Sequence, residues 1–367
     1  MIVLGFLLHN CSHVISEDQH GFLSKRSTST NLVTYVSIIQ RAICDGFPVD
    51  AVYTDLSAAF DKIDHRITIA KLQRIGLHGS FLNWIHSYLA GRSMQVKIVD
   101  CVSSPFPVTS GVPQGSHLGP LIFLLYINDV NFLLQCSKLS YADDFKLFSV
   151  IREAKDREFL QSQVDIFSYW CSLNQMVLNP SKCSTITFTR QRSPVHYNYK
   201  ILGSSLNRVS CVKDLGVMLD STLSKKNHVG YICSKASKQL GMIFRMTKYF
   251  RNIQCLKTLY VSLVRSTLEY CSVVWSPYYS NEINRLEKVQ RRFTRFALRH
   301  VFVDSPSYEI RCSTLRLDPL RTNYAFNEPV SSMCRVFERC YPVFDFHLSR
   351  PCQKSRFLSK LRDEHVF

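Results

Sequence analysis

Two adjacent carboxylates, Asp143 and Asp144, stand among apolar and aromatic residues in "KLSYADDFKLF", residues 138–148. Burying carboxylates without partners is costly, and a divalent cation would compensate that cost. The flanking segments "KLSYA" and "FKLFSV" have the pattern of two strands that meet at the acid pair. Taken alone, two acids at such a position are more typical of exposed turn residues.

A third carboxylate, Asp55, strengthens the interpretation as a metal site. It ends the β-rich run "VDAVYTDL", residues 49–56, where the chain passes into a segment with helical spacing. Three hard oxygen donors suit Mg²⁺. Two such ions about 3.5–4 Å apart activate an attacking hydroxyl and stabilise a leaving oxygen in phosphoryl transfer. This combination indicates polymerase or nuclease chemistry.

Three other acids are rivals for the same role. Asp61 and Asp64 lie one turn apart on the helix expected after Asp55, for which Ser57 is the predicted cap. There they are expected to favour the helix N-terminal region or to pair with basic residues. Asp129 follows Asn128 late in another expected helix and is interpreted as a cap or surface residue.

Strand-like and helix-like segments alternate up to about residue 220, which predicts an α/β architecture. Helices are expected over 81–92, closed by Gly91, from Gly119-Pro120 through "PLIFLLYINDV", and within 151–179. Strands are expected at "MQVKIV", residues 94–99, and at the end of "QMVLNPSKCSTITF", residues 175–188. Beyond residue 228 the pattern is continuously helical.

The net charge of +17 lies entirely in the C-terminal part of the chain. Residues 1–150 carry 11 Lys/Arg and 11 Asp/Glu, whereas the remaining residues carry 34 and 17. Such a one-sided basic balance indicates a polyanionic partner, nucleic acid or an anionic membrane surface, with solubility as the alternative reason.

One helical segment, residues 281–300, concentrates this charge. Its apolar residues recur at steps of three or four and form one stripe: Ile283, Leu286, Val289, Phe293 and Phe296. Its basic residues recur at the same steps and form a second stripe: Arg285, Lys288, Arg292, Arg295 and Arg299. A cationic helix face fits a nucleic-acid clamp, because each neutralised phosphate releases counterions. A solvated helix face is the alternative.

The cysteines and the chain start bear on the cellular compartment. Fourteen cysteines are scattered singly, which indicates reduced thiols, and the late cluster Cys334, Cys340 and Cys352 lacks the spacing of a zinc site. The start "MIVLGFLLHN" lacks the features of a signal peptide, and the run "PLIFLLYI" is too short to span a bilayer. A nuclear or cytoplasmic protein that is not secreted and has no membrane partner is expected.

Four stretches together resemble the reverse transcriptases of non-LTR (LINE-like, jockey-type) retrotransposons: "YTDLSAAFDKIDH", "SGVPQGSHLGPLIF", "YADDFKLF" and "LNPSKCSTITF". The resemblance covers roughly residues 15–325. It implies the right-hand polymerase fold, an α/β (α+β) structure with an antiparallel sheet and helices in the palm. The implied divisions are partial fingers (1–48), palm (49–222) and a helical, basic thumb-like region (223–325). The extension 326–367 has no assigned role.

The resemblance also implies roles for individual residues. Asp55, Asp143 and Asp144 become the metal-binding triad, and Lys182 lies near the nucleotide phosphates, where it is able to protonate departing pyrophosphate. Without the resemblance, a surface turn lysine is the simpler interpretation. Phe60 becomes the steric gate against a 2′-OH, with an ordinary core aromatic as the alternative.

The resemblance implies further roles, in which residues bind the template and the primer. Gln114 and Gly115 line the nucleotide and template pocket, where glycine permits close backbone approach. The segment 212–220, "VKDLGVMLD", matches the primer-grip strand pair with Gly216 at its bend. The basic stripe, with Lys288, Arg292, Arg295 and Arg299, then grips the template–primer duplex.

The sequence departs from the family pattern at several points. The fingers motif commonly reads "QHGFRPGRST", whereas this chain has "QHGFLSKRST", with Leu23 for the arginine and Lys25 for the glycine. Arg26 alone keeps a phosphate-binding cation there, and His117 replaces a small apolar residue. The match starts in the middle of the fingers, which favours interpretation as an N-terminally truncated fragment.

The expected function is an RNA-directed DNA polymerase, a nucleotidyltransferase that extends a DNA primer on an RNA template. It would use deoxynucleoside triphosphates and two Mg²⁺ ions, for which Mn²⁺ is able to substitute. The alternative is an inactive remnant that binds nucleic acid without synthesis. A metal-dependent nuclease is a third hypothesis, but it leaves "GVPQG" and the basic helices without a role.

Overall fold

The computed structural model describes residues 2–302, 304 and 306–323. The segment 326–367, with Cys334, Cys340 and Cys352, lies outside the described residues.

A five-stranded sheet occupies the centre of the N-terminal two thirds of the chain, in the order β11-β8-β1-β7-β6. Its central strands are β1 (Val49–Thr54) and β7 (Asp144–Val150), flanked by β6 (Ser137–Tyr141) and β8 (Ser184–Phe188). All neighbours are antiparallel except β11 (Asn207–Arg208), which pairs with β8 in parallel. The strands predicted at the acid pair and after "QMVLNPSKC" are therefore confirmed.

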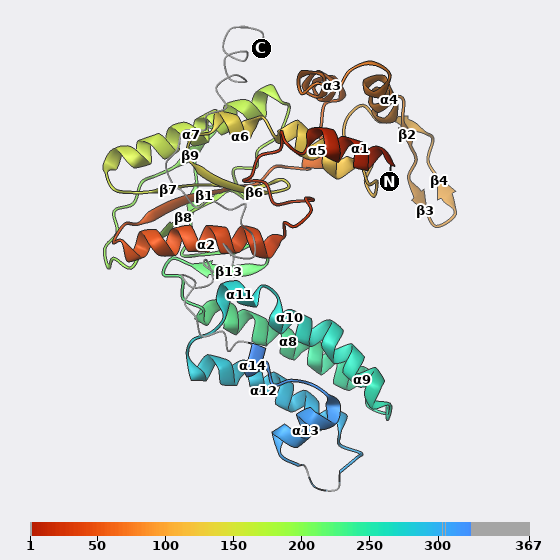
Figure 1. Cartoon of the computed structure of the whole chain (residues 1–367), viewed down its shortest axis with the longest axis vertical. Helices are drawn as coiled ribbons and strands as arrows, with labels where there is room; N and C mark the ends of the chain where they lie inside the picture. The colour runs from red at the N-terminus through yellow and green to blue at the C-terminus, as the bar shows by residue number, and fades with distance from the viewer. Residues whose placement is uncertain (1, 303, 305, 324–367) are drawn as a thin grey trace. The chain divides into compact units, whose positions relative to one another are not determined.

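Two long helices cover opposite faces of this sheet (Figure 1). Helix α2 (Thr28–Cys44) begins at a capping box in which Ser27 and Thr30 bond each other's backbone N–H. Its Tyr35 packs on Phe148 of β7, with ring centroids 5.0 Å apart. Helix α7 (Ala154–Leu173) covers the other face, where its Phe167 lies 5.2 Å from the ring of Phe145. Alternation along each strand thus sends successive residues to different helices.

The apolar helix α5 (Gly119–Ile127) is buried along almost its whole length, with Pro120 in its first turn as expected. It packs with α3 (His65–Arg74), α4 (Gly79–Leu89) and α1 (Ile2–Cys11) in one core that continues to the sheet. The short helix α6 (Val130–Leu133) follows α5. Asp129, between them, pairs with Lys71 at 2.8 Å and accepts a hydrogen bond from Trp170.

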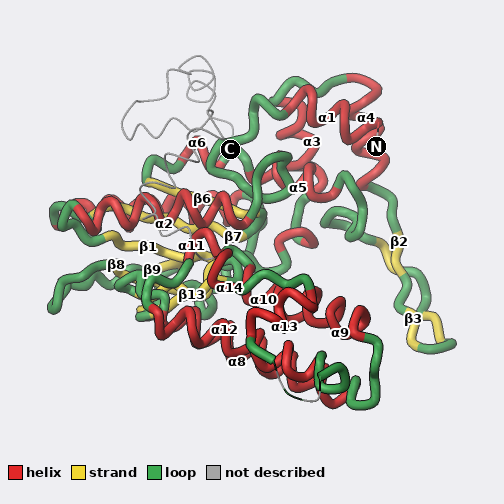
Figure 2. The backbone as a smooth tube through the Cα atoms, turned by 60° about the horizontal axis from the view of Figure 1, so that its bottom comes forward, coloured by secondary structure: helices red, strands yellow, loops and turns green. Residues whose placement is uncertain are grey.

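Two local predictions are wrong. Ser57 does not cap a helix: a 3-10 turn at Ala59–Asp61 intervenes, and α3 begins only at Asp64, whose carboxylate accepts the N–H groups of Arg66 and Ile67. The expected strand at 94–99 is divided into β2 (Ser93–Met94) and β3 (Lys97–Ile98). They pair with β5 (Phe106–Pro107) and β4 (Cys101–Val102) in an arm that projects from the rest in Figure 2.

Two small strand pairs follow α7. The first joins β9 (Lys200–Ile201) to β10 (Ser204–Ser205), and the second joins β12 (Cys211–Asp214) to β13 (Val217–Asp220). Gly216 has φ +90° at the turn of the second pair, as its expected place at the bend requires. This β12–β13 hairpin lies at the start of the helical part of the chain.

The described chain after residue 225 is helical, as predicted. Its elements are α8 (Lys226–Met246), α9 (Ile253–Leu259), the π-helical turn η2 (Tyr260–Arg265), α10 (Ser266–Glu269), α11 (Ser272–Trp275), α12 (Ser280–Ala297), α13 (Tyr308–Leu315) and α14 (Leu320–Asn323). Helix α12 packs on α8 through the predicted apolar stripe, with Leu286, Val289 and Phe293 buried.

None of the helices in the described residues is long and apolar enough to cross a membrane. The cysteines described in the structure form no disulfide with one another.

A buried carboxylate fixes the α7 side of the sheet. Asp50 in β1 is fully buried and accepts hydrogen bonds from Thr187 (2.6 Å) and Tyr199 (2.9 Å), while Arg157 of α7 lies 3.3 Å away. Three donors converge on this one side chain, so the network depends on its charge.

We expect Asp50→Ala to lower the free energy of unfolding by about 3–5 kcal/mol, because it leaves Arg157 and two hydroxyl groups without their acceptor. Urea unfolding followed by circular dichroism measures the change. The control is Asp165→Ala on the exposed side of α7, expected to change stability by only about 0.5 kcal/mol. Equal effects of the two substitutions would contradict the prediction.

Candidate active site

The three predicted acids meet at one end of the two central strands. The antiparallel register pairs Thr54 of β1 with Phe145 of β7, so the next residues outward, Asp55 and Asp144, are neighbours across the strands. Asp143 precedes Asp144 in the turn from β6, where Tyr141 pairs with Asp144. The sheet therefore brings together residues that are almost ninety positions apart in sequence.

The turn that carries the acid pair is held by residues that sequence analysis missed. Ala142 has φ +56°, and its N–H and C=O are both bonded to the buried Gln19 side chain, at 2.9 and 3.3 Å. Gly21 lies against the same residue, since a Cβ on it would be 2.4 Å from the Ala142 nitrogen. The "QHG" of the fingers motif was the available signal, but its partner is more than a hundred residues away.

Asp55 lies beside the turn that leads into β8. Its backbone C=O accepts the N–H of Asn179, and its N–H donates to Cys183 Sγ. Lys182 Nζ is 3.7 Å from Asp55 Oδ2, and this buried oxygen accepts no hydrogen bond from the described residues. The predicted lysine therefore does lie at the acid cluster, and one carboxylate oxygen there has an open acceptor position.

The acids repel one another electrostatically. Burial raises the pKa of Asp143, and the nearby charge of Asp55 raises it further, against an opposing backbone hydrogen bond. Burial, followed by the charges of Asp143 and Asp214, raises the pKa of Asp144 to about 6, while Lys146 opposes that rise. The neighbouring carboxylates thus make ionisation of Asp143 and Asp144 harder, and positive charge placed beside them would relieve this.

These donors fit a hard divalent cation. Carboxylate oxygens are its preferred ligands, and the unbonded Asp55 Oδ2 is a buried acceptor that such an ion would satisfy. In the described residues no three acidic, His or Cys side chains already converge on a common metal position. The strands bring the predicted ligands to one end of the sheet, and binding of a metal ion would have to draw their side chains together.

Phe60, Gln114 and Gly115 are also brought together. Val112 N–H bonds the C=O of Phe60, and the Gln114 amide donates to Asp61 at 2.8 Å, so the loop containing Gly115 runs along the Phe60 turn. The half-buried Phe60 ring stacks on Phe123 at 4.2 Å and meets the edge of Phe22 at 6.0 Å.

Arg26 does not project freely as expected of a phosphate-binding cation. Its Nη1 donates to the backbone C=O groups of Ser16, Glu17 and Gln19, which fold the guanidinium back against the segment that holds Ala142. Burial lowers its pKa. Lys25, where the family commonly has glycine, has φ +62°, a conformation that glycine adopts without the cost of a side chain.

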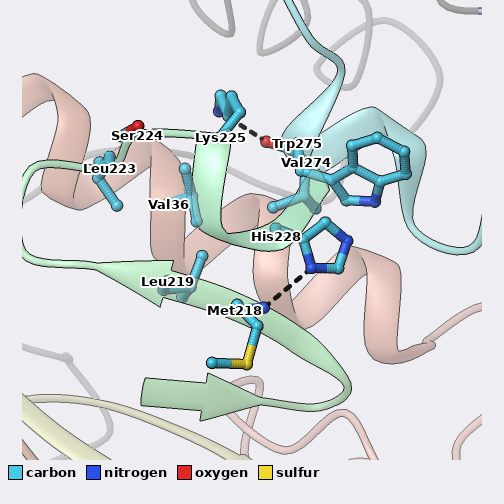
Figure 3. Close-up of a pocket in the computed structure, with 9 residues that line it drawn as sticks. All are labelled: Val36, Met218, Leu219, Leu223, Ser224, Lys225, His228, Val274 and Trp275. Atoms are coloured by element: carbon cyan, nitrogen blue, oxygen red, sulfur yellow. Dashed lines mark hydrogen bonds between the residues drawn. The ribbon is translucent and has the colours of Figure 1, made fainter. Parts of the chain in front are cut away.

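The β12–β13 hairpin lies on a compact support from α8 and α11 (Figure 3). His228 Nδ1 accepts the N–H of Met218, so its Nε2 carries the proton, and the ring packs against Trp275. Burial lowers the pKa of His228 to about 4, and Lys225 adds to this. The cavity beside it measures about 10 Å³, enough for about one water molecule and no larger ligand.

The basic stripe of α12 divides into two kinds of residue. Lys288, Arg292 and Arg295 are exposed, which fits both a nucleic-acid-binding face and the alternative of a solvated helix face. Arg299 lies just beyond the end of α12, so it is not on the helix face as predicted. It is half-buried, donates to the C=O groups of Phe296 and Lys248, and lies 3.8 Å from the centre of the Phe296 ring. The Arg299 guanidinium therefore binds groups of the helical region itself.

Comparison with known proteins identifies the family. The reverse transcriptase (RNA-dependent DNA polymerase) family matches residues 4–219, which is more than half of the chain. The chain belongs to the reverse transcriptase family. The matched residues include all three acids, Lys182 and the loops that contain Phe60 and Gln114. Members of this family act with divalent metal ions on a nucleic-acid template.

The relatives are proteins of mobile elements. The chain is 27% identical over 324 residues to a probable RNA-directed DNA polymerase from transposon BS of Drosophila melanogaster, covering 83% of this chain and 34% of that protein. It is also 27% identical over 303 residues to the RNA-directed DNA polymerase from mobile element jockey of Drosophila funebris, covering 77% and 32%. The chain thus spans about a third of the length of these relatives. The expected resemblance to non-LTR reverse transcriptases is confirmed.

Among solved structures, the apo telomerase of Candida tropicalis is similar with a TM-score of 0.46 and 12% sequence identity. The match covers 81% of this chain and 48% of the telomerase chain.

We expect Gly21→Ala to displace the acid-bearing turn, because the new Cβ would meet the Ala142 backbone nitrogen at 2.4 Å. Amide hydrogen exchange of residues 138–148 should become roughly tenfold faster, as measured by mass spectrometry. Gly5→Ala is the control, since no heavy atom lies within 4 Å of that added Cβ. Unchanged exchange in Gly21→Ala would show that the turn does not depend on this close approach.

Proposed function

We propose that the chain is the polymerase core of an RNA-directed DNA polymerase, which extends a DNA primer on an RNA template by nucleotidyl transfer from deoxynucleoside triphosphates. The observation that supports this most directly is the register of β1 and β7, which makes Asp55 and Asp144 neighbours in a chain of the reverse transcriptase family. Carboxylates from two adjacent strand ends are suited to hold the two metal ions that this type of phosphoryl transfer uses.

Asp55, Asp143 and Asp144 would hold two Mg²⁺ ions, which Mn²⁺ is able to replace. Bound there, the ions would lower the pKa of the primer 3′-OH and stabilise the charge on the leaving phosphate. Lys182, 66% exposed and 3.7 Å from Asp55, would turn from this carboxylate toward the triphosphate of the nucleotide. Its ammonium group is then placed to give a proton to pyrophosphate as the P–O bond breaks.

The neighbouring loops would select the nucleotide. Phe60 stacks rigidly on Phe123, so its ring edge is suited to exclude a ribose 2′-OH, while Gln114 and Gly115 would line the pocket for base and template. Arg26 would act through the segment 16–19 rather than by direct phosphate contact. In polymerase terms, residues 1–48 correspond to partial fingers, 49–222 to the palm and 223–325 to the thumb. The described thumb residues end at Asn323.

The template–primer duplex would lie along the exposed cations of α12. Lys288, Arg292 and Arg295 supply phosphate contacts, and Arg299 holds the helical region together behind them. The β12–β13 hairpin is assigned to the primer grip. We assign activity in the nucleus or cytoplasm, where nucleic-acid substrates are available.

We expect the purified protein to extend a primed RNA template with dNTPs and Mg²⁺, and Asp143→Ala/Asp144→Ala to reduce this about a thousandfold or more because the metal ligands are lost. Incorporation of labelled nucleotide measures the rate. Asp100→Ala, which removes an exposed acid between β3 and β4, serves as the control with unchanged extension.

Two outcomes of this assay would contradict the proposal. Salt-sensitive binding of template–primer without extension by the wild type would indicate a nucleic-acid-binding remnant. Cleavage of the template without extension would indicate a nuclease that uses the same acids.

We expect Lys288→Gln/Arg292→Gln/Arg295→Gln to weaken duplex binding and to reduce the slope of log K against log salt by up to about 3, roughly 0.9 for each lost phosphate contact. Fluorescence anisotropy across a salt series measures the slope. The control removes three exposed cations elsewhere, Lys155, Arg190 and Arg192, and should leave the slope unchanged. Equal slopes in the two triple variants would make the α12 stripe an ordinary solvated surface.

A further inference from the structure

The sheet face that carries the catalytic acids also carries a buried cation. Lys146 follows Asp144 by two residues on β7, and alternation along a strand puts such residues on the same face. The register places Tyr53 of β1 opposite Lys146, and Tyr53 precedes Asp55 by two residues. Tyr53 and Lys146 therefore form the cross-strand row directly behind the Asp55–Asp144 row.

Both members of this row bind one carboxylate of the β12–β13 hairpin. Lys146 Nζ is 2.6 Å from Asp214 Oδ2, and Tyr53 Oη donates to the same oxygen at 3.2 Å. The Lys146 and Asp214 side chains are only 4% and 6% exposed. Tyr35 of α2 completes the cluster, with its ring 4.5 Å from Lys146 Nζ and its hydroxyl 3.1 Å from Tyr53 Oη.

Stability alone does not account for this charged pair. Replacing a buried ion pair by apolar residues of similar volume is often neutral or stabilising, because two charges need not then be taken out of water. What the pair adds is a unique position, since a short hydrogen-bonded contact fixes distance and direction, whereas apolar side chains tolerate sliding. At the turn, directly after Asp214, the hairpin is also held by Tyr270, whose hydroxyl donates to the Leu215 C=O at 2.9 Å.

We propose that Asp214, Lys146 and Tyr53 are positioning residues that lock the primer-grip hairpin to the two acid-bearing strands and so set where the primer 3′ end meets the metal site. This proposal rests on the polymerase function proposed above. The lock links β12 to β1 and β7 by direct side-chain bonds, so a shift of the hairpin relative to the acids must break them.

The test replaces the pair by apolar residues in the full chain, as Lys146→Met/Asp214→Leu. The variant should keep its thermal midpoint within about 4 °C of wild type, because no unpaired charge is left buried. Its extension rate at saturating dNTP should fall about 10- to 100-fold through misplacement of the 3′ end. KM for dNTP should stay within about twofold, because the nucleotide loops are untouched.

A matched control removes another lysine–aspartate pair. Lys71→Met/Asp129→Leu breaks an ion pair between α3 and the α5–α6 junction, away from the hairpin, and should leave the extension rate unchanged. Wild-type rates in Lys146→Met/Asp214→Leu would overturn the proposal. So would an equal loss in both double variants, which would show a general effect of losing an ion pair.

Amide hydrogen exchange of residues 211–220 tests the proposed lock independently of the proposed polymerase function. If wild type does not extend primers, the polymerase function is wrong, and the lock is judged by exchange alone. Exchange in the hairpin should be faster in Lys146→Met/Asp214→Leu than in wild type and in the Lys71/Asp129 control. Unchanged exchange would overturn the lock in either case.

Discussion

The site depends on one constraint, the antiparallel register of β1 and β7. Pairing of Thr54 with Phe145 makes Asp55 and Asp144 neighbours, and the short turn after β6 adds Asp143. The result is an electrostatically unfavourable arrangement, in which burial and neighbouring charge raise the pKa of Asp144 to about 6. Raised carboxylate pKa values of this kind cluster at functional sites, which agrees with the proposed role of these acids. As the pH falls toward 6 the metal-free site takes up protons, so cation binding there must displace them.

The acid cluster attracts a basic side chain, Lys182. Lys182 comes within 3.7 Å of Asp55, while Asp55 Oδ2 keeps an open acceptor position. Because Lys182 is two thirds exposed, it leaves this position at little cost, whereas the buried Lys146 is held by Asp214 and cannot. The two lysines near the acids therefore differ: Lys182 is exposed, as the proposed phosphate role needs, and Lys146 is buried in an ion pair with Asp214.

The sequence predicted those helices and strands whose formation depends on residues within one segment of the chain. The β6–β7 strands and the apolar stripe of α12 follow from patterns within one segment, and the buried helix α5 follows from Gly119-Pro120 and the continuous apolar run after it. The contacts that could not be predicted join distant segments, such as Gln19 with Ala142 and Lys146 with Asp214, since a single sequence carries no signal of which residues meet. Arg26 illustrates the same limit: its charge was evident, but the backbone carbonyl groups that bind it were not. Ser57 failed as a cap because a 3-10 turn delays the helix to Asp64.

The two faces of the sheet act together in building the site. A slip of β1 by one residue would send Tyr53 and Asp55 to the α7 side, because strand side chains alternate with a period of two. Asp50 opposes that slip from the α7 side, where its carboxylate binds Thr187 of β8 and Tyr199 and pairs with Arg157 of α7. Such a slip would bring the Asp50 carboxylate to the face lined by Tyr35 and Phe148, where its charge would be buried without these partners. A network that touches no catalytic residue thus fixes the register on which the acids, the hairpin lock and the proposed chemistry all depend.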